Sequence, residues 1–288
     1  MLTHRILTVC LALAAAVAWA ETDTARLDAV LADQPAEMQA RYAARHPAET
    51  LAFFEVAPGA TVIEAFPGDG WYTRILAAYL GPDGRLVGAD YALDMYPRFG
   101  FFTLGQVQAR ENWVNDWVNG AVAWQGPADA LLSAFVFGSM PEALHGAADT
   151  VLFVRALHNL ARFEAEGGYL GAALQDAWIA LKPGGVVGVV QHLAREDMPD
   201  EWADGSNGYL KEAFVIERFT AAGFEFVGRS EINFNENDVP GSEDRVWRLP
   251  PTLATSRGNP ERREAMEAIG ESHRMTLKFR KPESKEAP

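Results

Sequence analysis

The segment 61–90 constrains the fold of this chain more than any other. A β-branched run opens the segment and favours a buried strand. Gly68 and Gly70 then allow a turn that side chains would obstruct. Apolar residues at helical spacing follow, and a second strand ends at Asp90. An acid in that place accepts the hydroxyls of a ribose, so the segment predicts a nucleoside-type site on a parallel sheet.

The rest of the chain continues this alternation of strands and helices. Further strands are predicted at 121–124, 150–154, 186–190, 224–231 and 275–280, and helices at 47–54, 94–119, 168–181 and 211–222. An apolar run at 130–147 is ambiguous because Gly138 and Pro141 interrupt it. The last strand follows no helical crossover and is a candidate for antiparallel insertion. The expected fold class is therefore α/β, with a doubly wound, mostly parallel sheet and helices on both faces.

The first twenty residues have the pattern of a cleavable signal peptide. Arg5 supplies a positive start, residues 6–17 are apolar, and Ala18-Trp19-Ala20 has the small-x-small form of a cleavage site. The apolar run is shorter than the roughly 20 residues that span a bilayer. An uncleaved anchor is therefore the weaker alternative. We expect cleavage after Ala20, a periplasmic or secreted protein, and no stable membrane insertion.

Composition narrows what the mature chain can do. Its only cysteine, Cys10, lies in the signal segment, which excludes disulfides, thiolate metal sites and cysteine nucleophiles from residues 21–288. The net charge of −14 becomes −15 once Arg5 is removed. Such a surface repels phosphate backbones, so nucleic acid is not an expected partner. The length suits a single domain, with a core at about 47–234 and a C-terminal extension at 235–288 that holds the last strand. The oligomeric state stays open.

Four features occur in a fixed order along the chain. Glu64 ends the first strand, the glycine turn and Asp90 follow, and residues 181–185 (LKPGG) precede a later strand. In this order the chain resembles the class I S-adenosylmethionine (SAM) dependent methyltransferases over roughly 47–234. More narrowly, it is similar to the predicted exported bacterial methyltransferases of that class. The further matches are residues 64–73 (EAFPGDGWYT), His158-Asn159, residues 208–211 (GYLK) and residues 270–277 (GESHRMTL).

The resemblance implies a Rossmann-like methyltransferase fold with seven strands, and SAM as the cofactor. Glu64 and the turn 66–70 would hold the methionine part of SAM, Asp90 the ribose, and Tyr91 and Asp129 would lie near the adenine. The implied cofactor-binding residues are Glu64, Phe66, Pro67, Gly68, Gly70, Tyr72, Asp90, Tyr91 and Asp129. One departure stands out, because Phe66 replaces the first glycine of the usual motif.

His158, Asn159 and His192 are the candidate catalytic residues. They follow predicted strands and should lie at the carboxyl edge of the sheet, where ligands bind in open α/β folds. A neutral histidine can take a proton from an acceptor hydroxyl or amine. A structural role, with the histidine capping a helix and the asparagine bonding to backbone, is the alternative. No metal is expected, because no dense ligand spacing accompanies the histidines.

Arg155 has two interpretations. It could pair with an acidic substrate or close a structural ion pair, and the structural interpretation is the simpler one. Glu271 and Arg274, in the C-terminal matching segment, are expected to be structural.

The sequence therefore predicts SAM-dependent methyl transfer to a small-molecule acceptor outside the cytoplasm. A non-catalytic SAM- or nucleoside-binding protein on the same fold is the first alternative. Phe66 and Asp69 in the turn favour it, and so does the location, because SAM is made in the cytoplasm. An NAD-dependent oxidoreductase would also explain a glycine turn with a downstream acid. It is disfavoured because the turn lacks the G-x-G-x-x-G spacing.

Overall fold

A computed structural model describes residues 22–283, so the predicted signal segment and its cleavage site lie outside the described residues. The sheet has seven strands in the order β3-β2-β1-β4-β5-β7-β6. The strands are β1 (Thr61–Ala65), β2 (Arg85–Asp90), β3 (Leu131–Val136), β4 (Ala148–Val154), β5 (Leu181–His192), β6 (Glu225–Ser230) and β7 (Arg274–Arg280). Strands β1 to β5 pair in parallel, and β7 lies antiparallel between β5 and β6. The predicted fold class and the antiparallel insertion are both confirmed.

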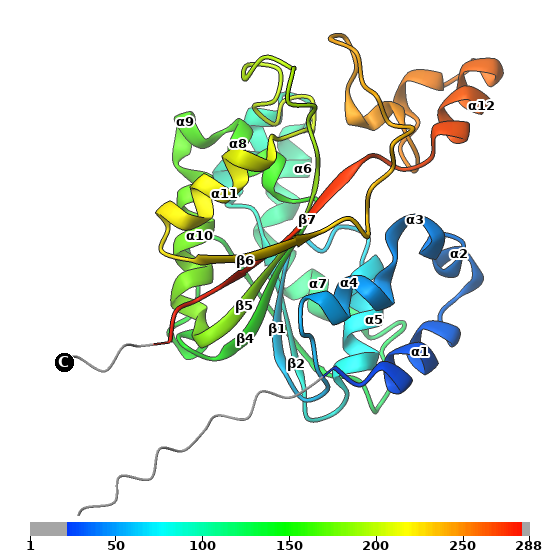
Figure 1. Ribbon diagram of the computed structural model, residues 1–288. Helices are drawn as coiled ribbons and strands as arrows, with labels where there is room; N and C mark the ends of the chain where they lie inside the picture. The colour runs from blue at the N-terminus through cyan, green and yellow to red at the C-terminus, as the bar shows by residue number, and fades with distance from the viewer. Residues whose placement is uncertain (1–21, 284–288) are drawn as a thin grey trace, which may run out of the picture.

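Helices cover both faces of this sheet (Figure 1). The α-helices are α1 (Thr24–Ala32), α2 (Ala36–Gln39), α3 (Tyr42–Arg45), α4 (Pro47–Phe53), α5 (Trp71–Leu80), α6 (Leu104–Ala109), α7 (Trp113–Ala121), α8 (Leu157–Arg162), α9 (Glu164–Gly167), α10 (Tyr169–Ala180), α11 (Glu212–Ala221) and α12 (Pro260–Ile269). Short 3-10 turns are η1 (Leu93–Phe99), η2 (Arg110–Asn112), η3 (Glu142–Leu144), η4 (Val246–Arg248) and η5 (Ala254–Ser256). None of the helices in the described part of the chain is long and apolar enough to span a membrane.

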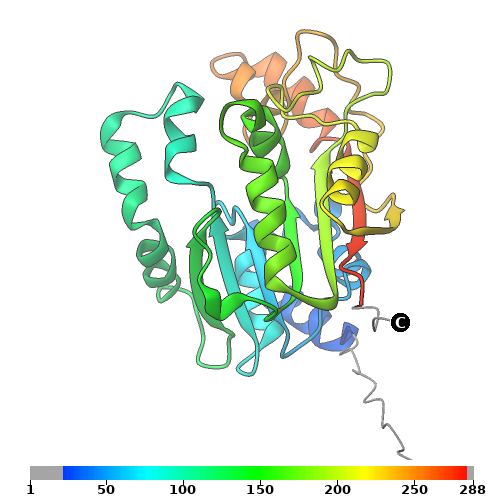
Figure 2. The same cartoon turned by 90° about the vertical axis from the view of Figure 1, so that its left-hand side faces the viewer.

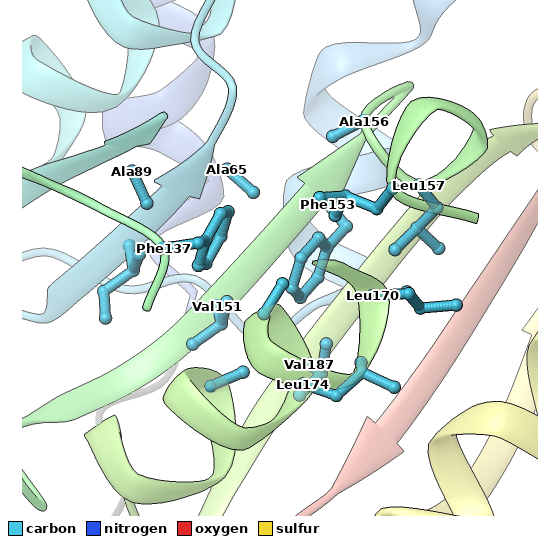
Figure 3. Packing of buried hydrophobic residues seen from close by; sticks show 14 of the residues in the cluster. Ala65, Ala89, Phe137, Val151, Phe153, Ala156, Leu157, Leu170, Leu174 and Val187 are labelled. Atoms are coloured by element: carbon cyan, nitrogen blue, oxygen red, sulfur yellow. The ribbon is translucent and has the colours of Figure 1, made fainter. Parts of the chain in front are cut away.

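Alternating side chains of the central strands build two apolar layers. Val151 and Phe153 of β4 pack with Leu170 and Leu174 of α10 on one face (Figure 3). The intervening Leu152 packs on the other face with residues of α1, α4 and α5. When successive residues of a strand are buried on opposite faces of the sheet, the strand has a continuous apolar sequence. For this reason β4 could be predicted from the sequence.

The third strand was predicted at the wrong place. Residues 121–124 end α7 and form a turn, whereas β3 begins at Leu131, inside the run that the sequence left ambiguous. This strand lies at the edge of the sheet and is largely half-exposed, although its sequence (LLSAFV) is mostly apolar. Gly138 and Pro141, which made the run ambiguous, lie beyond the end of the strand at Val136. Figure 2 shows the segment 93–121 standing beside this edge.

Two segments lie over the carboxyl edge of the parallel strands. One consists of α2 and α3, and the other is the long connection 231–273 between β6 and β7 (Figure 1). A buried ion pair stabilises the connection: Arg248 Nη2 lies 2.7 Å from Asp238 Oδ1. The Asp238 carboxylate also accepts hydrogen bonds from the Tyr209 hydroxyl at 3.1 Å and the His273 amide at 3.0 Å. We call residues 231–273 the roof segment.

Candidate active site

A cavity of about 610 Å³ lies at the carboxyl edge of the sheet. It is lined by the turn 66–70, by residues at the ends of β1, β2, β4 and β5, and by residues of α2, α3 and the roof segment. Its volume falls within the range of about 300–1,000 Å³ that is typical of small-molecule sites. The position is the one expected for ligands in open α/β sheets.

Asp90, at the end of β2, offers one unused acceptor to this cavity. The residue is 1% exposed, and the Tyr96 hydroxyl donates to Oδ2 at 2.6 Å, with Arg110 Nη1 at 3.5 Å from the same oxygen. The other oxygen, Oδ1, is buried and accepts no hydrogen bond from any described residue. Burial raises the pKa of Asp90. Because an unpaired buried acceptor is costly, Oδ1 fits a ligand that brings a hydroxyl donor.

Glu64 lies at the end of β1 and is 4% exposed. The Thr73 hydroxyl of α5 donates to its Oε2 at 2.7 Å. Burial raises the pKa of Glu64 to about 8, and this single hydrogen bond only partly offsets the shift. The carboxyl group is therefore mostly neutral at pH 7. A cationic ligand beside it would favour the ionised form.

Phe66 takes the place of a glycine without blocking the cavity. Its backbone has φ of 51°, a left-handed conformation that costs a non-glycine residue about 1–3 kcal/mol. The ring stacks on Tyr91 with the centroids 4.3 Å apart, a contact that is worth about 0.5–1.5 kcal/mol beyond its buried area. Tyr91 donates to the Ala156 carbonyl at 2.9 Å and accepts from Asn159 Nδ2 at 3.3 Å. The phenylalanine ring is thus part of the cavity wall.

The hydrogen bonds of His158 determine its tautomer. Gln191 Nε2 donates to the Gly208 carbonyl at 2.9 Å, which leaves Gln191 Oε1 facing His158 Nδ1 at 3.3 Å. Because that oxygen can only accept, Nδ1 carries the proton and Nε2 holds a free lone pair. Burial is the main reason that the pKa of His158 is lowered to about 4; the charges of Arg155 and Arg162 add to the shift, and the Gln191 hydrogen bond opposes it. The ring is neutral at pH 7 and can accept a proton.

His192 lies beside His158, with the two ring centroids 5.4 Å apart. Its Nδ1 is 2.6 Å from the Ser272 hydroxyl. Burial lowers the pKa of His192, and the neighbouring His158 and Arg155 act in the same direction. Among the described residues, no group of three or more His, Cys, Asp or Glu side chains is placed to hold a metal ion.

The structure brings most of the predicted site residues to one cavity. The lining includes Glu64, Phe66, Pro67, Gly68, Gly70, Tyr72, Asp90, His158, Asn159 and His192. Tyr91 does not line the cavity, and its ring stacks against the ring of Phe66. Asp129 also lies outside it, because it precedes β3 and its carboxylate accepts from the Gly126 amide at 2.8 Å. The expectation for Asp129 depended on the misplaced third strand.

Sequence reasoning missed the basic side chains of the cavity. The cavity is lined by Arg41, in the turn before α3, and by Arg45 of α3. Glu271 and Ser272 of the roof segment line it as well. These residues come from opposite ends of the chain, and no local motif marks them as a group. Arg155 lines the same cavity and forms no ion pair with any described residue, although the charge of Glu271 acts on it, so both interpretations of this arginine stay predictions.

Comparisons with known proteins agree with this architecture. No family model and no curated protein matches the chain. Among solved structures, the chain is similar to the [4+2]-cyclase SpnF, with a TM-score of 0.51, 18% identity, and coverage of 83% of this chain and 82% of that one. It also matches the putative methyltransferase in a Haloferax volcanii complex with the Trm112 activator (TM-score 0.48, 18% identity, coverage 89% and 97%). A SAM-dependent methyltransferase from Aquifex aeolicus matches with a TM-score of 0.48, 13% identity and coverage of 91% and 100%. At these identities the comparison shows a shared fold alone.

Proposed function

We propose that this protein transfers the methyl group of SAM to a small-molecule acceptor. The observation that carries the proposal is the convergence of three features on one cavity. These are the unpaired Asp90 Oδ1, the glycine turn at the start of α5, and the neutral His158. Several of the solved structures with a related fold are SAM-dependent methyltransferases, one of them with bound S-adenosylhomocysteine.

The residues of the cavity fit this cofactor. Asp90 Oδ1 would accept from a ribose hydroxyl, and Glu64 would ionise beside the ammonium and sulfonium groups. The α5 N-terminus follows Gly70, and no side chain caps it, so its free amides suit the cofactor carboxylate. When bound, SAM would supply a methyl group on a sulfonium: the acceptor atom would bond to the methyl carbon in line with the sulfur–methyl bond, which would break and release S-adenosylhomocysteine.

The protein mainly has to align the acceptor and remove its proton. His158 Nε2 is the free base on the cavity wall and would take the proton from an acceptor hydroxyl or amine. Trp247 and Leu249 of the roof segment line the cavity as well, which limits the access of water. Asn159 is a positioning residue, because its side-chain Nδ2 donates a hydrogen bond to the Tyr91 hydroxyl.

A non-catalytic protein that binds SAM or a nucleoside is the second candidate. The turn favours it, because Phe66 and Asp69 line the cavity where the usual motif has small residues. The two candidates differ in turnover: the second predicts tight binding of SAM and no formation of S-adenosylhomocysteine with any small acceptor.

Replacing Asp90 with alanine should weaken the binding of S-adenosylhomocysteine. Hydrogen bonds to a charged group contribute about 1.5–3 kcal/mol, so we expect a loss of about 10- to 150-fold in affinity by calorimetry. Asp129→Ala is the matched control, because that carboxylate lies outside the cavity, and it should bind like the wild type. Binding of NAD in place of S-adenosylhomocysteine would favour an oxidoreductase and overturn the proposal.

We also propose that the protein acts outside the cytoplasm. The support is the signal-like segment 1–20. After expression of the full chain in a bacterial host, the periplasmic fraction or the medium should contain a protein whose N-terminal residue is Glu21. Changing Ala18 and Ala20 to tyrosine should prevent cleavage. A full-length chain confined to the cytoplasm would refute the expectation.

A further inference from the structure

Three arginines bond to one carboxylate at the histidine end of the cavity, and the charge of a fourth acts on it. Arg41 Nε and Arg45 Nε donate to Glu271 Oε1 at 2.9 and 3.1 Å, and Arg274 Nη1 donates to Oε2 at 3.2 Å. The charge of Arg155 also acts on Glu271 and on the other arginines. We call Arg41, Arg45, Arg155 and Arg274 the arginine cluster. The cluster carries four positive charges, and the carboxylate of Glu271 is the one acid that bonds to it among the described residues.

Hydrogen bonding within the cluster is equally incomplete. Arg45 is 2% exposed, and its Nη1 is buried without an acceptor. Arg274 Nε is also buried without an acceptor. No described residue accepts a hydrogen bond from the side chain of Arg155, although this residue lines the cavity. Buried guanidinium N–H donors without acceptors are costly. Of these arginines, Arg45 and Arg155 line the cavity, where their free donors suit a bidentate anionic ligand.

Burial and mutual repulsion do not remove these charges. They lower the pKa of Arg45 to about 10 and that of Arg155 to about 10. Both groups therefore stay protonated at neutral pH. In a chain whose net charge is −14, this local excess of positive charge is a specific feature of the cavity.

The cofactor would not neutralise the arginine cluster. The acidic side chains Glu64, Asp69 and Asp90 line the other part of the cavity, around the turn and the ends of β1 and β2, and Glu37 of α2 forms no ion pair with the arginine cluster. SAM carries a carboxylate, an ammonium group and a sulfonium, so it adds one net positive charge. Its carboxylate also has the free amides of α5 available. The cavity thus needs a second ligand that is negatively charged.

We infer that the methyl acceptor is a small organic acid whose carboxylate binds Arg45 and Arg155, next to His158 and His192. The inference rests on the proposed function and names its substrate class. Both arginines and both histidines line the same cavity. A carboxylate held by two guanidinium groups would orient the rest of the acceptor towards the histidines.

Small carboxylates test this inference directly. We would titrate benzoate, and benzamide as its uncharged analogue, into the full protein saturated with S-adenosylhomocysteine. Benzoate should bind at least about tenfold more tightly than benzamide, and Arg155→Gln should abolish that preference. Arg45→Gln is a second variant with the same expected loss. Arg74→Gln removes a charge from the turn side of the cavity and should keep the preference.

Two outcomes would overturn the inference. Equal binding of benzoate and benzamide to the wild type is the first. The second is a loss of S-adenosylhomocysteine affinity in Arg155→Gln with unchanged binding of 5′-methylthioadenosine, which lacks the amino-acid end. That result would assign the cluster to the cofactor carboxylate. Failure of S-adenosylhomocysteine to bind the wild type would instead refute the proposed function, and the benzoate titration of the ligand-free protein would still test the cluster.

Discussion

Replacement of His158 with alanine is expected to lower the rate of methyl transfer by about 100- to 10,000-fold, the usual contribution of a general base. The affinity for S-adenosylhomocysteine should change by less than about twofold, because the carboxylate of Asp90 and the turn are untouched. The measurement is the formation of S-adenosylhomocysteine with an acceptor that the wild type methylates. His145→Ala, at an exposed histidine outside the cavity, should leave the rate unchanged.

The pH profile gives a second readout of His158. Its pKa is lowered to about 4 because burial disfavours the charged ring. The base form is therefore present above about pH 4 and is lost as the pH falls through that value. We expect the acidic limb of the rate at about pH 4 and not near the usual histidine value of 6.5. An unchanged rate in His158→Ala would remove this histidine from the mechanism.

Replacement of Asp238 with alanine should destabilise the protein by about 3–5 kcal/mol, because it leaves the buried Arg248 without its closest counterion. The loss should be measured as the free energy of unfolding in urea. Arg248 retains a weaker contact with Asp244 at 3.4 Å and a hydrogen bond to Tyr209 at 3.0 Å. These contacts do not replace a charge at 2.7 Å in a buried site.

Glu267→Ala is the matched control for this change. It breaks the exposed pair with Arg263, whose atoms are 2.9 Å apart, and should cost less than about 1 kcal/mol. If Asp238→Ala also lowered the free energy of unfolding by less than about 1 kcal/mol, the Arg248 pair would not hold the roof segment in place.

The order of strands and helices could be predicted where the pattern is local. The first strand, the turn at Gly68 and Gly70, and α5 follow one another within twenty residues, and each has a strong signal of its own. The third strand was predicted at the wrong place because Gly138 and Pro141 made the apolar run that holds it ambiguous, while the apolar residues at the end of α7 resemble a short strand.

The site was predictable only in part. Asp90 and His158 end or follow strands, so their common location follows from the topology of a parallel sheet. The arginine cluster is different, because Arg45, Arg155 and Arg274 meet through tertiary packing across more than two hundred residues of sequence. Phe66 also required the structure, since its stacking on Tyr91 explains how a turn without the usual glycine is held.

A crystal structure of the protein with S-adenosylhomocysteine would test the central claim most directly. We predict a ribose hydroxyl within hydrogen-bonding distance of Asp90 Oδ1, and the cofactor sulfur in the cavity that His158 lines. A complex in which the ligand lies elsewhere, with Asp90 bonded to Tyr96 and Arg110 alone, would contradict the account.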